Sequence, residues 1–280
     1  MKFGINTFLF ASPFTNDSID LFPSFKKWGF DSVEIALEDA SHIDPAVVKA
    51  ALIDNGLKCG SICAALGPGR DLRGTQEEQN ASLEYIKSVL DIMPLLDCPI
   101  LVGPLYSSVG RAEVVTQEQY KIQWDIVVTH LKALSEYAQE LNLKLAIEPL
   151  NRYETDFINT CEQGLKLIKD VDSDSVMLHL DAYHMNIEEK DPANAIIKAG
   201  TKLGHFHACG CDRGTPGGDQ INWEKISAAL EQINYRGDVV IESFTQDVKV
   251  IAKAASIWRK IEPSQEDIAI DGLKFLQSKI

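Results

Sequence analysis

The sequence predicts an α/β fold, a (β/α)8 or TIM barrel that forms a single domain over residues 1–280. Short apolar runs alternate with longer segments of helical spacing roughly every 30 residues, as expected when about 250 residues build eight strand–helix pairs. This alternation requires a parallel sheet, and eight repeats favour closure into a barrel. No long linker divides the chain, and no GxGxxG motif follows the first strand, which removes the usual support for a dinucleotide-binding fold.

The predicted strands are short apolar runs bounded by Gly, Pro, Asp or Asn. Each run is too short for a helix and is followed by a segment with the spacing of a helix. The eight strands are predicted at 2–6, 32–37, 57–64, 98–103, 143–148, 176–181, 202–207 and 239–242.

The predicted helices are bounded by capping residues and by glycine or proline. Asp44 followed by Pro45 opens a helix at the position that proline prefers, Gly56 ends that helix, and Thr160 caps another. Helices are predicted at 18–28, 45–55, 76–96, 117–141, 161–170, from 192, at 223–233 and at 265–276. Residues 182–191 are expected to form a loop.

Composition and charge exclude several classes of function. The chain has 45% hydrophobic and 24% charged residues, which is ordinary for a globular protein. A net charge of −14 without a run of Lys or Arg would repel a nucleic-acid backbone, so we expect no nucleic-acid partner. No apolar run reaches about 18 residues and no signal peptide precedes the first strand, so we expect no membrane contact and a cytoplasmic protein.

The six cysteines are too sparse for a disulfide scaffold, and most are expected to be reduced and buried. Cys209 and Cys211 would face the same side of a strand as His207, so a zinc site formed by these three residues is one alternative. Gly210 and Asp212 indicate, against it, that the strand has already ended.

Four consecutive predicted strands each end in a residue that can bind a metal ion: Glu148, Asp181, His207 and Glu242. In a barrel, the carboxyl ends of the strands converge on one mouth. Three carboxylates crowded there would repel one another unless a cation neutralised them. Three oxygen donors and one imidazole suit Mn²⁺, Co²⁺ or Mg²⁺ better than structural zinc. One acidic strand end alone would be a solvated residue, but four on adjacent strands predict a metal site.

Other polar residues near these strand ends are assigned weaker roles. His205 faces the same way as His207 but one layer deeper, where it is expected to support the site rather than bind the metal. Glu34 could face either the mouth or the surrounding helices. The remaining histidines are interpreted as structural: His42, His130 and His179.

Several segments resemble one family of barrel enzymes, the ketose 3-epimerases. These are the D-tagatose and D-psicose (allulose) 3-epimerases of the xylose-isomerase-like barrel superfamily. The resemblance covers most of the chain and is most specific in its carboxyl-terminal half. The segments are IEPLNRYE (147–154), HLDAYHMNIEE (179–189), HFHACGCDRGTPGGD (205–219), VVIESF (239–244) and SIWRKI (256–261).

The resemblance implies that the four strand-end residues bind one divalent ion per subunit, usually Mn²⁺ or Co²⁺, and that the ketose is held on it through O2 and O3. It implies that Glu148 and Glu242 act on opposite faces of C3, and that the protein is a homodimer or homotetramer. The substrates implied are free ketoses such as D-tagatose, D-fructose or D-psicose, and L-ribulose. The family pattern places the sugar beside Glu154, His184, Arg213, Phe244, Phe8, Cys63 and Leu105.

Elementary chemistry agrees with these roles. A C–H bond beside a carbonyl is too weakly acidic for a carboxylate to ionise unaided, and a Lewis acid on the carbonyl oxygen stabilises the developing cis-enediolate. Inversion requires an acid/base group on each face of C3, and two carboxylates can exchange these roles. Arg213 adds a fixed positive charge that orients the substrate oxygens.

Other functions stay open at this point. An aldose–ketose isomerase usually recruits a second metal, for which no clear ligand set is present. A hydroxypyruvate-isomerase-like or inosose-dehydratase-like activity would use the same four ligands. An abasic-site endonuclease of this fold requires a histidine-rich zinc site and would be repelled from DNA by the acidic surface. A metal- or sugar-binding barrel without activity would not require carboxylates on both faces of a sugar.

Overall fold

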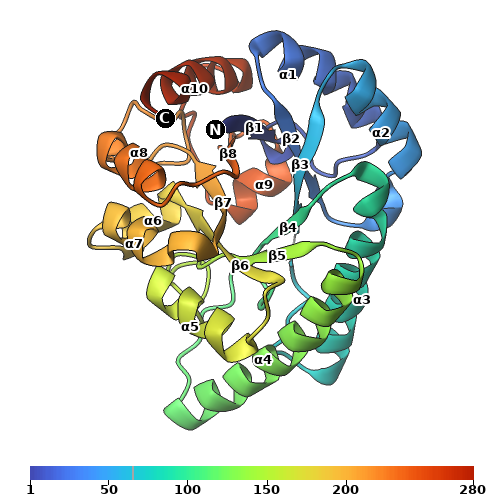
Figure 1. Cartoon of the computed structure of the whole chain (residues 1–280), viewed down its shortest axis with the longest axis vertical. Helices are drawn as coiled ribbons and strands as arrows, with labels where there is room; N and C mark the ends of the chain where they lie inside the picture. Colours follow the sequence, from blue (N-terminus) through green and yellow to red (C-terminus); the bar gives the residue numbers. More distant parts are fainter. Residues whose placement is uncertain (65) are drawn as a thin grey trace.

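The computed structural model describes residues 1–64 and 66–280 and has the predicted closed barrel. Eight parallel strands hydrogen-bond in sequence order, and β8 pairs with β1 to close the sheet (Figure 1). Three strands have the predicted bounds, and the others differ by one or two residues at an end. The strands are β1 Lys2–Asn6, β2 Ser32–Leu37, β3 Lys58–Ala64, β4 Ile100–Gly103, β5 Lys144–Ile147, β6 Val176–Asp181, β7 Leu203–Ala208 and β8 Asp238–Ile241.

The helices form an outer ring around the strands (Figure 1). Three of them begin with a capping box, in which a threonine and a glutamate or glutamine satisfy each other's backbone N–H groups. The helices are α1 Phe22–Trp28, α2 Pro45–Asp54, α3 Gln76–Ile92, α4 Gln117–Glu140, α5 Cys161–Val171, α6 Ala182–Glu188, α7 Pro192–Ala199, α8 Trp223–Gln232, α9 Lys249–Ala254 and α10 Gln265–Lys279.

Proline sets two helix boundaries that the periodicity misplaces. The helix predicted at 18–28 starts as a 3₁₀ segment, Asn16–Leu21, and becomes α-helical only at Phe22, next to Pro23. The helix predicted at 76–96 ends at Ile92, and a separate 3₁₀ turn follows over Pro94–Leu96. Proline has no N–H to donate and clashes with the preceding turn, so it starts or ends a helix rather than continuing it.

Two helices near the barrel mouth are absent from the prediction. Residues 182–188 form α6 rather than a loop, because the Asp181 carboxylate accepts hydrogen bonds from the N–H groups of Tyr183 and His184 and caps the helix. The short helix α9 lies inside the ring of outer helices in Figure 1 and contributes Ile251 to a cavity at the mouth. At six residues, α9 is too short to show a helical period in the sequence.

The barrel interior is polar at its mouth end. Asn6, Glu34 and Ser61 are register partners on β1, β2 and β3. His179 and Asp181 pair with His205 and His207 across β6 and β7. All of these side chains are buried within the barrel, and an apolar layer between the strands and the helices surrounds them. A buried layer of this polarity indicates a functional site rather than packing alone.

No helix among residues 1–64 and 66–280 is long and apolar enough to cross a membrane.

Candidate active site

The four strand-end residues predicted as metal ligands come together at the mouth. Glu148, Asp181, His207 and Glu242 each offer one ligand atom, all four residues are buried, and these atoms lie within 4.8 Å of one another. The Nδ1 atom of His207 lies 3.2 Å from Glu242 Oε2 and 3.6 Å from Asp181 Oδ2. The carboxyl ends of β5 to β8 therefore supply one compact set of donors.

Arg213 is the cation that faces these carboxylates. Its Nη1 lies 2.6 Å from Asp181 Oδ2 and 3.1 Å from Glu242 Oε2, and its Nη2 lies 2.9 Å from His184 Nε2. The guanidinium also stacks over the Tyr183 ring. Arg213 adopts a positive φ of 69°, and its carbonyl accepts the backbone N–H of Phe244, which follows β8. A buried guanidinium with these partners is held as a fixed positive charge.

Burial and neighbouring charges shift the pKa values of Glu148, Asp181 and His207 in different directions. Burial raises the pKa of Glu148 well above its usual range, and the neighbouring Glu242 raises it further. Burial also acts to raise the pKa of Asp181, but Arg213 and His207 outweigh it and hold that pKa well below its usual range. Burial alone would lower the pKa of His207, yet the charges of Glu242 and Glu34 raise it well above its usual value.

A cavity of about 520 Å³ opens above the cluster. Of the four candidate ligands, Glu148 and Glu242 line it, whereas Asp181 and His207 lie beneath them and are essentially unexposed. The apolar part of the wall comes from the loops after several strands and from α9. It consists of Phe8, Ala64, Leu66, Pro68, Pro104, Val109, Leu150, Phe244, Val250, Ile251, Ala254 and Ala255.

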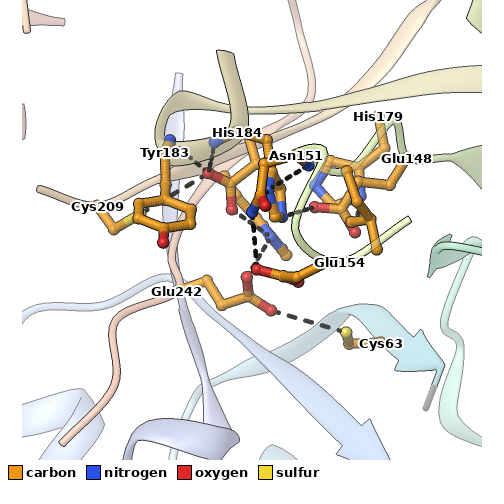
Figure 2. A network of polar contacts seen from close by, with 12 residues as sticks. Cys63, Glu148, Asn151, Glu154, His179, Tyr183, His184, Cys209 and Glu242 are labelled. Carbon is orange, nitrogen blue, oxygen red and sulfur yellow. Dashed lines mark hydrogen bonds and ion pairs between the residues drawn. The ribbon is translucent and has the colours of Figure 1, made fainter. Parts of the chain in front are cut away.

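Most of the residues expected beside a sugar line this cavity: Glu154, His184, Arg213, Phe244, Phe8 and Cys63. Figure 2 shows Cys63 facing Glu242, with its Sγ 3.9 Å from Glu242 Oε1. Leu105 is the exception, because its side chain is fully buried in the hydrophobic core and its neighbour Pro104 forms the wall instead. The backbone turn after β4 directs Leu105 away from the mouth, which strand position alone does not indicate.

Asn151 is a site residue that the sequence reasoning missed. Its Nδ2 donates to Glu154 Oε1 at 2.8 Å, and its backbone N–H donates to His184 Nδ1 at 3.0 Å (Figure 2). Burial and the charge of Arg213 lower the pKa of His184 to about 3, so this imidazole is uncharged at neutral pH. The position of Asn151, a polar residue shortly after the end of β5, is the sequence feature that could have indicated its place in the site.

A second missed residue is Asn6, at the carboxyl end of β1. Its Nδ2 donates to Glu34 Oε1 at 2.7 Å and to Glu242 Oε1 at 3.2 Å. Glu34, whose direction the sequence left open, faces the barrel interior, where it contacts both His205 and His207. His205 lies one layer below the ligands, as its offset from His207 predicts.

The structure does not bring together the alternative zinc ligands. β7 ends at Ala208, and Cys209 packs between Arg213 and Asp181, with its Sγ 3.5 Å from Arg213 Nη1. Within residues 1–64 and 66–280, neither Cys209 nor Cys211 belongs to a group of side chains that could hold a metal ion. His179 packs in the barrel interior, with its Nδ1 3.6 Å from Glu148 Oε2.

Known proteins share this fold and much of this sequence. A family model described as a xylose isomerase-like TIM barrel matches residues 22–279. A probable ketose 3-epimerase of Synechocystis sp. is 36% identical over 99% of this chain and 96% of its own length. A D-psicose 3-epimerase of Enterocloster bolteae is 32% identical over 97% of this chain and 91% of its own length.

Solved structures agree with these relatives. A D-allulose 3-epimerase from Methylomonas sp., crystallised in complex with D-allulose, superposes with a TM-score of 0.93 and is 27% identical, covering 100% of this chain and 97% of that chain. An L-ribulose 3-epimerase structure superposes with a TM-score of 0.91 at 28% identity and covers 99% and 95% of the two chains. The chain therefore belongs to the xylose isomerase-like TIM barrel family and, within it, to the ketose 3-epimerases, which are enzymes of the isomerase class.

Proposed function

We propose that this enzyme inverts C3 of free ketoses in a metal-dependent reaction, with Glu148 and Glu242 as the two acid/base groups. The observation that carries the proposal is that these two carboxylates line the cavity, while the other two members of the cluster lie beneath them. Asp181 and His207 can therefore bind a metal ion but cannot reach a substrate, whereas Glu148 and Glu242 can do both.

The donor set fits one divalent cation. Glu148 Oε1 and His207 Nδ1 are buried without a hydrogen-bond partner, and a bound cation would offset the cost of desolvating both atoms. Glu148, Asp181, His207 and Glu242 would hold the ion, and oxygen-rich donors with one imidazole favour Mn²⁺, Co²⁺ or Mg²⁺. When bound, the ion would supply Lewis acidity at the substrate carbonyl, worth several kcal/mol of charge stabilisation.

In the proposed reaction, one carboxylate takes the proton from C3, and the electron pair of the C–H bond moves toward the C2 carbonyl to give a cis-enediolate. The other carboxyl group then donates a proton to the opposite face of C3, and the product is the C3 epimer. Burial raises the pKa of Glu148, which suits a group that must carry a proton in one half of this cycle. Exchange of the two roles gives the reverse reaction.

Three polar residues of the cavity are assigned to orienting the sugar. The Arg213 guanidinium is fixed by Asp181 and would attract the oxygen on which negative charge develops. Asn151 holds both Glu154 and the uncharged imidazole of His184. These two side chains would hydrogen-bond the hydroxyls next to the carbonyl. Phe8, Cys63 and Phe244 belong to the less polar part of the cavity wall. The carbon atoms of the sugar beyond C3 would lie against these side chains.

The substrates we propose are free ketoses of the kind named in the relatives: L-ribulose, D-psicose (D-allulose) and its C3 epimer D-fructose, and D-tagatose. The proposed assembly, a homodimer or homotetramer, rests on the family resemblance and is tested by light scattering of the purified protein.

Solvent exchange at C3 tests the proposed reaction. Protein stripped with a chelator and reconstituted with Mn²⁺ is incubated in D₂O with D-tagatose, D-fructose and L-ribulose. We expect the C3 epimer of at least one sugar to form with one deuterium at C3, and we expect a chelator to stop the exchange. Deuterium at C1 would indicate an aldose–ketose isomerase, and no exchange into any sugar would leave a dehydratase or a binding protein.

A further inference from the structure

We propose that Glu34, a buried residue of β2, is a positioning residue that fixes the ring of His207 so that its Nδ1 faces the metal site. Glu34 has no exposed surface and does not line the cavity, so no substrate touches it. The inference rests on the proposed function, because it takes His207 as a metal ligand.

Polar donors surround both oxygens of the Glu34 carboxylate. Oε1 accepts hydrogen bonds from Asn6 Nδ2 at 2.7 Å and from His207 Nε2 at 2.6 Å. Oε2 accepts from the Ser61 hydroxyl at 2.5 Å and lies 2.7 Å from His205 Nε2. An ionised carboxylate can only accept hydrogen bonds, so His207 must donate the proton of its Nε2.

The other nitrogen of His207 is left for a cation. Its Nδ1 is buried without a hydrogen-bond partner and lies 3.2 Å from Glu242 Oε2, on the side of the ring away from Glu34. An uncharged imidazole that donates from Nε2 presents the Nδ1 lone pair, which is the form that binds a metal ion. The negative charge of Glu34 also makes this lone pair a stronger donor.

Asn6 extends the same control to Glu242. Its Nδ2 bridges Glu34 Oε1 and Glu242 Oε1, while its Oδ1 accepts the N–H of Phe8 at 2.8 Å. The bond to Phe8 fixes which end of the amide points at the carboxylates. Glu242 Oε1 is thereby held on the Asn6 side, and its Oε2 is directed toward His207 and Arg213.

A role confined to packing would not select this residue. An apolar side chain would leave the donors of Asn6, Ser61 and His207 unsatisfied. A glutamine could accept hydrogen bonds only at its one oxygen, and its NH₂ group would face another donor. A carboxylate can accept at both of its oxygens, here from Asn6 and His207 at Oε1 and from Ser61 at Oε2. The network therefore predicts a defect in metal binding, rather than in folding alone, when the charge of Glu34 is removed.

The first test requires no substitution. In ¹⁵N-histidine NMR spectra of the wild-type protein loaded with diamagnetic Mg²⁺, we expect His207 to carry its proton on Nε2 and its ligand on Nδ1. A proton on Nδ1, with Nε2 bound to the metal ion, would overturn the proposal. If the wild-type protein binds no divalent ion at all, the proposed function fails, and this outcome is distinct from a failure of the role of Glu34.

The second test compares Glu34→Gln with Ser61→Ala, which removes a donor to the same carboxylate without touching His207. Mn²⁺ affinity is measured by titration calorimetry, and folding is checked by circular dichroism. We expect Glu34→Gln to weaken Mn²⁺ binding about 10- to 100-fold, with kcat partly restored at saturating Mn²⁺, and Ser61→Ala to bind nearly as the wild type does. Equal Mn²⁺ affinities of a folded Glu34→Gln variant and Ser61→Ala would contradict the proposal.

Discussion

The Arg213 guanidinium and the Asp181 carboxylate form a fully buried ion pair, with Nη1 2.6 Å from Oδ2, at the base of the cavity. Asp181 has three roles at once, because it also caps α6 and belongs to the candidate metal cluster. The ion pair thus joins the lining of the cavity to the candidate metal cluster.

Removing Arg213 is expected to destabilise the metal-free protein most. Arg213→Ala leaves Asp181 and Glu242 buried without their cation, which typically costs about 3–5 kcal/mol. Bound Mn²⁺ would neutralise the same carboxylates and reduce that loss. Thermal unfolding of wild type and variant, each with and without Mn²⁺, measures the difference. The same loss of stability in both states would show that the ion does not share these carboxylates.

Replacing either proposed acid/base group is expected to slow inversion strongly but to spare proton exchange on one face of C3. In Glu148→Gln, Glu242 can still take the C3 proton from one epimer and return a solvent proton to the same face. In Glu242→Gln, Glu148 should exchange the C3 proton of the other epimer in the same way. Inversion should fall by about 10²–10⁴-fold. Each epimer is incubated with the variants in D₂O and excess Mn²⁺, and mass spectrometry and NMR measure the deuterium at C3 and the amount of the other epimer formed. Exchange into the same epimer by both variants would refute the assignment of the two faces.

Metal binding is expected to tighten as the pH rises. Glu148 and His207 have raised pKa values in the metal-free protein, and both must lose a proton to bind an ion. Protons are therefore released on binding, and the apparent Kd for Mn²⁺ should fall with increasing pH until both groups are deprotonated in the free protein. Calorimetry in two buffers of different ionisation enthalpy measures the protons released. A Kd independent of pH would contradict the raised pKa values.

Substitution of Leu105 is expected to lower the stability of the protein, whereas substitution of Phe244 is expected to raise the KM for the ketose. Leu105→Ala removes a fully buried core side chain and should cost about 2–5 kcal/mol of unfolding free energy, with the KM for the ketose little changed. Phe244→Ala removes part of the cavity wall, where the ring lies 4.9 Å from the Arg213 guanidinium, and should raise KM. Denaturant unfolding and steady-state kinetics of both variants test this. A large rise in KM for Leu105→Ala would return that residue to the substrate site.

The barrel and the candidate metal cluster were predictable from the sequence, because each depends on local patterns. Strand bounds differ by at most two residues, since a buried parallel strand is a short apolar run between turn residues. Glu148, Asp181, His207 and Glu242 close consecutive strands, and strand order alone brings their donor atoms together once the barrel closes. Polarity at the strand ends therefore determined where the site would lie.

Tertiary structure decided what surrounds that cluster. The β3 residue that faces Glu34 depends on a register shift, because Val33 pairs with Cys59 whereas Glu34 pairs with Ser61, and no local pattern records such a shift. The exclusion of Leu105 from the cavity depends on the backbone path after β4. The contacts of Asn6 with Glu242 join residues 236 positions apart and exist only because β8 closes against β1. Local sequence determines which side chains reach the mouth of a barrel, whereas closure and register determine which of them face one another.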